Sequence, residues 1–160
     1  MSKSSSEIAI SIHSILDLEE DLQSFFQAIL NDYCKRYKVK VKGGDYSINI
    51  TFVEASPIHG HGVTIKRDNC NKILVQVRDP YLSGWEPNAY TMYHFINVVA
   101  HEMVHVCQYL TGRQGMIADQ GKRQGSKKVE NYFFDPDEVE ARLLQDLYVC
   151  LYGQKFLNYD

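Results

Sequence analysis

Long apolar runs and a strong charge of either sign are both missing from this sequence of 160 residues. No stretch reaches the roughly 18 consecutive apolar residues that a transmembrane helix needs, so we expect no membrane span. The formal net charge of -3 is too small to produce a field that would attract nucleic acid or a lipid surface. The N-terminal residues contain no apolar stretch of the signal-peptide kind, so we expect no secretory leader.

Cysteine is scarce as well, and this bears on both metal binding and location. The four cysteines form no C-x-x-C pair, which excludes a zinc ribbon on spacing alone. Three of them fall among apolar neighbours in segments with helical periodicity, which favours small buried thiols over disulfides. Because free thiols persist in reducing compartments, we expect a cytoplasmic protein.

What the sequence does contain is typical of one globular domain of the α+β class. Its length and its 44% apolar share fit a single domain over residues 1–160, with residues 1–12 expected to be disordered. Apolar residues at three- and four-residue steps predict an N-terminal helix over residues 15–37, and alternating patterns predict strands further on. The other expected elements are strands at 46–52, 62–67 and 73–78, with 38–42 as a candidate fourth strand, and helices at 90–111 and 136–152. We therefore expect a small sheet of three or four strands, antiparallel or mixed, beside three helices.

Residues 101–105 have the sequence HEMVH, and they lie in the most apolar of the expected helices. Their spacing places His101 and His105 one above the other on one helix face, where two imidazoles can share a tetrahedral zinc ion. Glu102 lies about 100° away around the helix, so it is placed to take a proton from water rather than to bind the metal. A chance H-E-x-x-H in such a composition has a probability of roughly 1%, and a buried helix is a costly place for three ionisable groups. The motif therefore predicts a zinc site with Glu102 as catalytic base, and a pair of packed core histidines is the alternative.

The third protein ligand has to come from outside this motif. In the metzincin pattern a glycine follows three residues after the second histidine, but that position holds Gln108 here. The helix expected at 136–152 begins after Asp135, a favourable N-cap, and Glu138 occupies the capping-box position three residues on. The apolar stripe of this helix, extended back by one turn, reaches Glu140, so this carboxylate is expected to face the core, where a metal would satisfy it. We predict Glu140 as the third ligand, with Glu138 as the alternative.

HEMVH, followed about 35 residues later by the pair Glu140-Ala141 on a helix, resembles the gluzincin class of zinc metallopeptidases. The longer pattern, HEMVHVCQ and then YFFDPDEVEA, is similar to small metallopeptidase-like proteins of bacteriophages and mobile elements. The resemblance covers residues 98–142 and implies a minimal zincin-like domain that hydrolyses peptide bonds. It also implies that an edge strand, 62–67 or 73–78, lies beside the cleft, and that the host cytoplasm or a phage virion is the location.

The gluzincin pattern is not matched in full. Leu144 stands where thermolysin-like enzymes have an aspartate that supports the metal ligands. Their tyrosine and histidine that face the substrate have no clear counterpart here. We take Tyr132, just before the ligand helix, as the candidate for stabilising the oxyanion, with simple packing as its alternative role.

Two other functions stay open. A metal-stabilised binding or structural protein without catalysis, such as a virion or regulatory component, would share the ligands but would not need Glu102. Five basic residues within 112–131 suggest a nucleic-acid-associated protease. That segment lacks interleaved aromatic residues and carries Asp119 and Glu130, so a mobile loop or lid over the cleft is the better interpretation. We therefore expect a peptide or protein substrate, and neither nucleic acid nor a membrane as partner.

Overall fold

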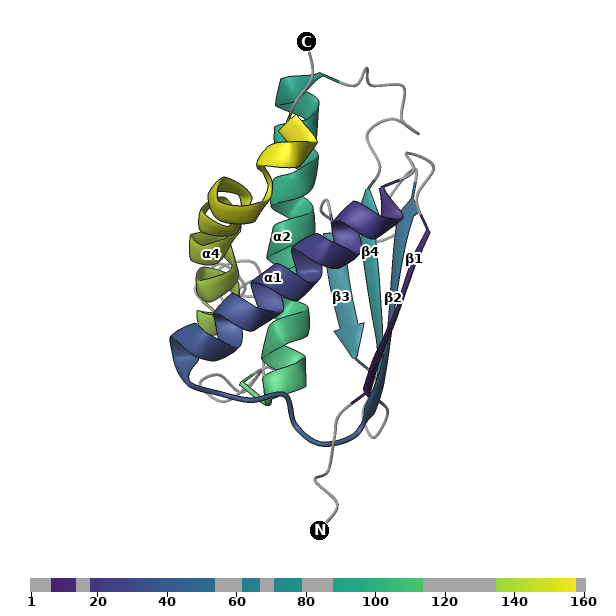
Figure 1. Ribbon diagram of the computed structural model, residues 1–160, viewed down its shortest axis with the longest axis vertical. Coiled ribbons are helices and arrows are strands. Elements are labelled where there is room, and N and C mark those ends of the chain that lie inside the picture. The colour runs from purple at the N-terminus through teal and green to yellow at the C-terminus, as the bar shows by residue number, and fades with distance from the viewer. Residues whose placement is uncertain are drawn as a thin grey trace, which may run out of the picture.

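The computed structural model describes residues 7–13, 18–53, 62–66, 71–78, 88–113 and 135–157, and these form the predicted α+β architecture. In this described part, a four-stranded sheet stands on one side and three α-helices on the other (Figure 1). The elements in chain order are β1 (Glu7–His13), α1 (Glu19–Tyr37), β2 (Asp45–Val53), β3 (Gly62–Lys66), β4 (Lys72–Arg78), α2 (Ala89–Thr111), α4 (Pro136–Tyr152) and the 3-10 helix η3 (Gln154–Leu157). None of the described helices is long and apolar enough to cross a membrane.

The sheet is mixed, with the strand order β1-β2-β4-β3. Both β1 and β4 run parallel to β2, whereas β3 runs antiparallel to β4 at one edge. Buried and exposed residues alternate along β2 and β4, which is the pattern of strands that turn one face to the core. The two candidate edge strands, 62–67 and 73–78, correspond to β3 and β4. Of these, β3 lies at an edge of the sheet and β4 is internal.

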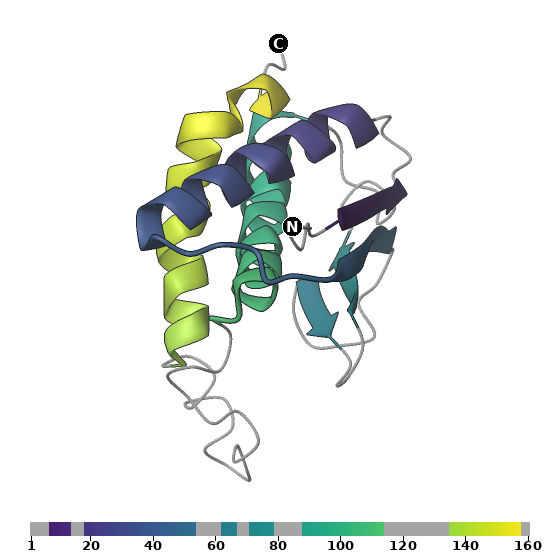
Figure 2. The same ribbon diagram turned by 60° about the horizontal axis from the view of Figure 1, so that its bottom comes forward.

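Helix α2 runs through the centre of the described structure, between the sheet and α4, and α1 crosses it (Figures 1 and 2). It contacts α1, α4, β3 and β4, so apolar residues on nearly every side of it are covered. The buried apolar residues of this helix are Met92, Phe95, Ile96, Val99, Ala100, Met103, Val104, Val106, Cys107 and Leu110. Any polar group on α2 that faces α4 or the sheet consequently lies in the interior.

Capping residues hold the ends of the two helices that carry the motif residues. Gly112 ends α2 in the left-handed conformation, with φ of 73°, which glycine adopts at helix ends without steric cost, and the end at Thr111 agrees with the helix expected at 90–111. The side chain of Asp135 accepts a hydrogen bond of 2.8 Å from the backbone N–H of Asp137, and Pro136 occupies the first position of α4. The start of α2 is held by a capping box between Asn88 and Thr91.

Two expectations about the first half of the chain are wrong. Residues 1–12 are not disordered throughout, because β1 pairs in parallel with β2 along its whole length. Its alternating Ile8, Ile10 and Ile12 pack against the core, and this short pattern becomes stable only beside a second strand. The segment 38–42 forms no strand; it connects α1 to β2.

Candidate metal centre

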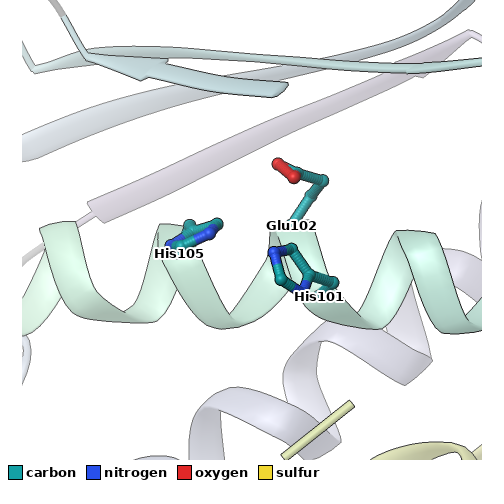
Figure 3. Close-up of side chains that lie close together, drawn as sticks. All are labelled: His101, Glu102 and His105. Atoms are coloured by element: carbon teal, nitrogen blue, oxygen red, sulfur yellow. The ribbon is translucent and has the colours of Figure 1, made fainter. Parts of the chain in front are cut away.

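Two histidines on α2 form one side of a candidate metal centre (Figure 3). His101 and His105 lie one helical turn apart, and the centroids of their rings are separated by 4.9 Å. The carboxylate of Glu102 projects away from the helix toward the strands (Figure 3). The four-residue spacing thus places both imidazoles on one face of α2 and the carboxylate on another, as the sequence predicted.

Glu138, in the first turn of α4, lies against both histidines. Its Oε2 is 3.0 Å from Nε2 of His101, and its Oε1 is 2.8 Å from Nε2 of His105. Further along α4, Gln145 contacts His101, so the two helices run antiparallel and the first turn of α4 comes beside His105. This arrangement brings two imidazole nitrogens and one carboxylate to a single point.

A glutamine contacts the other ring nitrogen of each histidine. Nδ1 of His101 lies 2.8 Å from Oε1 of Gln145, and Nδ1 of His105 lies 2.7 Å from Oε1 of Gln108. Contacts of this kind orient the rings of metal-binding histidines. In both rings it is therefore Nε2, and not Nδ1, that is turned toward Glu138.

The donor set at this point fits a zinc ion. Zinc prefers imidazole nitrogen and carboxylate oxygen among its ligands, and catalytic sites use three protein ligands. Nε2 of His105 is buried, and among the described residues its one close polar neighbour is Oε1 of Glu138 at 2.8 Å. A cation between nitrogen and carboxylate would satisfy both groups. The carboxylate of Glu102 also lies within 4.8 Å of the histidine nitrogens, but Glu138 touches both rings and is the better third ligand.

The charges of the candidate ligands complement one another. Burial acts to lower the pKa of His105, but the carboxylates of Glu138 and Glu102 outweigh it and raise this pKa to about 9. Burial acts to raise the pKa of Glu138. Its contacts with His101 and His105 outweigh burial and hold the pKa of that carboxyl well below its usual range. Glu138 is therefore ionised at neutral pH, as a metal-binding carboxylate must be.

Glu102 is a buried carboxylate, with 4% of its surface exposed, and β3 holds it in place. Burial raises the pKa of Glu102, although His105, His101 and a hydrogen bond from Thr64 act to lower it. Thr64 donates from Oγ1 to Oε2 of Glu102 at 2.8 Å. Gly62 approaches so closely that a Cβ there would come within 3.0 Å of Glu102 Cγ. A positioned carboxyl with a raised pKa is suited to accept and return a proton near neutral pH.

The expectation that Glu140 lies beside the histidines is wrong. Its Oε2 accepts a hydrogen bond of 2.7 Å from Nη2 of Arg113, and its Oε1 accepts one from the hydroxyl of Tyr33. Arg113 also donates from Nε to that hydroxyl at 2.9 Å. Glu140 does face the interior, as the apolar stripe predicted, but a guanidinium neutralises it there. The Glu140-Ala141 detail of the gluzincin resemblance thus falls on a residue that does not contact the histidines.

Sequence reasoning missed several partners of these groups: Thr64 donates to Glu102, Arg113 and Tyr33 donate to Glu140, and Gln145 contacts His101. Gln145 is seven residues after Glu138 and therefore on the same face of α4. Helical periodicity could thus have predicted that it lies near the histidines. Thr64 is 38 residues from Glu102, and no local pattern connects them. Tyr132, the oxyanion candidate, and residues 114–131 of the basic segment lie outside the described residues.

Comparison with known proteins adds no relative to this picture. No protein-family model, no curated protein and no solved structure matches the chain. The gluzincin resemblance therefore stays a prediction, and the function has to be inferred from the residues and their geometry.

Proposed function

We propose that this chain is a zinc-dependent endopeptidase, with His101, His105 and Glu138 as metal ligands and Glu102 as the general base. The proposal rests on the approach of both Nε2 atoms to one carboxylate, at 3.0 and 2.8 Å, on a helix that carries the H-E-x-x-H pattern. When bound by such ligands, zinc supplies the Lewis acidity that lowers the pKa of water and polarises a carbonyl oxygen. The gluzincin resemblance of the sequence supports the same reaction.

In this proposal Glu102 transfers a proton from the attacking water to the leaving amine. Its carboxylate lies within 4.8 Å of the histidine nitrogens, so it can take a proton from a water held next to the ligands. It then passes that proton to the leaving amine of the cleaved peptide bond. The hydrogen bond from Thr64 holds one carboxylate oxygen, which orients the other for proton transfer.

An extended peptide is the substrate that the neighbouring strand favours. Within the described part of the chain, β3 is an edge strand that pairs only with β4. Gly62 and Thr64 of this strand lie against Glu102, so a peptide that adds to the edge of β3 would run past the catalytic base. Main-chain hydrogen bonds of this kind bind many sequences, while side-chain pockets select among them. We therefore propose unfolded segments of proteins as the substrate class.

We also propose a reducing compartment, such as the cytoplasm of a host cell, as the working location. Cys34, Cys107 and Cys150 are free thiols, which supports this location. Among the three described cysteines, the expected burial holds for Cys107, whereas Cys34 is half-buried and Cys150 is exposed; Cys70 lies outside the described residues.

Metal analysis together with a cleavage assay tests the proposed function. We expect the purified protein to hold one zinc ion per chain and to cleave a labelled unfolded protein. A chelator should remove both the zinc and the cleavage, and added zinc should restore both. Protein that takes up no zinc from a zinc-containing buffer, or cleavage that survives complete chelation, would contradict the proposal.

Thr64→Val should change how cleavage depends on pH. The substitution removes the donor to Glu102, and that hydrogen bond lowers the pKa of this carboxyl. Without it the pKa rises further, so we expect the acidic limb of the pH–activity profile to move to higher pH by about one unit. Thr51→Val on β2 is the matched control and should leave the profile unchanged. An unmoved acidic limb in Thr64→Val would argue against Glu102 as the titrating base.

A further inference from the structure

Gln108 is the one glutamine of α2, and its side chain is fully buried, with 0% of its surface exposed. Its Nε2 donates to the backbone carbonyl of Asp137 at 3.0 Å and to Oε1 of Glu140 at 3.2 Å. Both of these groups can only accept hydrogen bonds. The amide nitrogen of Gln108 must therefore face α4, and its oxygen must face the opposite way.

The fixed amide decides which nitrogen of His105 carries hydrogen. Oε1 of Gln108 lies 2.7 Å from Nδ1 of His105, and an amide oxygen can only accept. Nδ1 of His105 must then be the donor. In the neutral ring this leaves the lone pair on Nε2, the atom that faces Glu138 at 2.8 Å.

We propose that Gln108 is a positioning residue that holds His105 in the Nδ1–H tautomer, so that Nε2 is presented as a metal ligand. The role in metal binding rests on the proposed function, whereas the hydrogen bond from Nδ1 of His105 to Oε1 of Gln108 is a property of the metal-free protein. Without a metal, Glu138 attracts a hydrogen to Nε2 as well, and a bound cation would replace that hydrogen. Gln108 touches His105 and not the substrate, so it acts through the ligand.

Glu140 and Arg113 help to fix the orientation of the Gln108 amide. Glu140 accepts from Gln108 through Oε1, and its Oε2 is held by Arg113 at 2.7 Å. Arg113 in turn lies over the ring of Tyr37, 3.9 Å from the ring centroid. The carboxylate of Glu140 is thus held in one orientation, and together with the Asp137 carbonyl it keeps the amide of Gln108 from turning over. The buried glutamate that the sequence assigned to the metal instead orients a residue that contacts a ligand.

Gln108→Met is the first test, because methionine fills a similar volume without hydrogen bonds. We expect zinc affinity, measured by competition with a chelator, to fall by ~10- to 100-fold. NMR of metal-free protein should show the Nδ1 hydrogen of His105 protected from exchange with water in the wild type, and this protection should be lost in Gln108→Met. Gln23→Met, on the exposed face of α1, is the matched control and should leave both the zinc affinity and the Nδ1 hydrogen of His105 unchanged.

A shorter amide separates positioning from packing. Gln108→Asn keeps the amide, but its shorter side chain withdraws the oxygen from Nδ1 of His105, so we expect the same losses as in Gln108→Met. Gln108→Asn is also the variant to measure if Gln108→Met does not fold.

The outcomes separate this inference from the proposed function. A protected Nδ1 hydrogen and wild-type zinc affinity in folded Gln108→Met would overturn the inference and leave the metal site standing. An Nδ1 hydrogen that exchanges freely in the wild type would also overturn it. A wild-type protein that binds no zinc would refute the proposed function, while the Nδ1 hydrogen of His105 would still decide the role of Gln108.

Discussion

Glu102→Gln is expected to lower kcat for peptide cleavage by about 100- to 10,000-fold and to leave the zinc content unchanged. The amide cannot accept the proton of the attacking water, but it has almost the same shape as the carboxylate. Its oxygen can still accept the hydrogen bond that Thr64 donates to Oε2 of Glu102. Single-turnover cleavage of a labelled peptide, with zinc measured in the same preparation, checks both halves of the expectation.

The control for this substitution is Glu20→Gln, on the exposed face of α1, which removes the same charge away from the site. It should retain full activity. If Glu102→Gln and the wild type instead behave alike in every cleavage assay, Glu102 has no catalytic task. The chain would then be better described as a metal-stabilised binding or structural protein.

Glu138→Ala is expected to weaken zinc binding by more than about 100-fold, because it removes a ligand and not merely a supporting contact. The two histidines would remain, and a site with two protein ligands holds zinc poorly. Zinc affinity can be followed by competition with a coloured chelator, and the fold by circular dichroism.

Glu140→Ala is the matched control, since the two glutamates lie two positions apart on the same helix. It should keep most of its zinc affinity, because the Asp137 carbonyl still accepts from Gln108, but it should lose stability, because Arg113 and Tyr33 lose their shared acceptor. The side chains of Arg113 and Glu140 are 24% and 15% exposed, so we expect the free energy of unfolding to fall by about 1–3 kcal/mol. Zinc retained in Glu138→Ala and lost in Glu140→Ala would reverse the ligand assignment.

Glu138 and Glu140 of α4 show what the apolar periodicity of a helix can predict and what it cannot. The apolar stripe correctly placed Glu140 toward the interior, and the capping rules correctly placed Asp135 at the helix start. Residues two apart on a helix differ by about 200° in direction, so Glu138 and Glu140 face different neighbours. Which of the two faces meets α2, and which meets α1, depends on how three helices pack.

The sequence by itself determined the buried helix with its His-Glu-His pattern, its end near residue 111, the helix that follows, and the α+β class. These features follow from local periodicity and capping, which depend on residues a few positions apart. Only the tertiary structure decided that β1 joins the sheet, that Thr64 holds Glu102, and that Glu138 meets the histidines. Each of these contacts joins residues about 30 or more positions apart in sequence. Their geometry is set by the packing of whole elements against one another, and no short stretch of sequence encodes that packing.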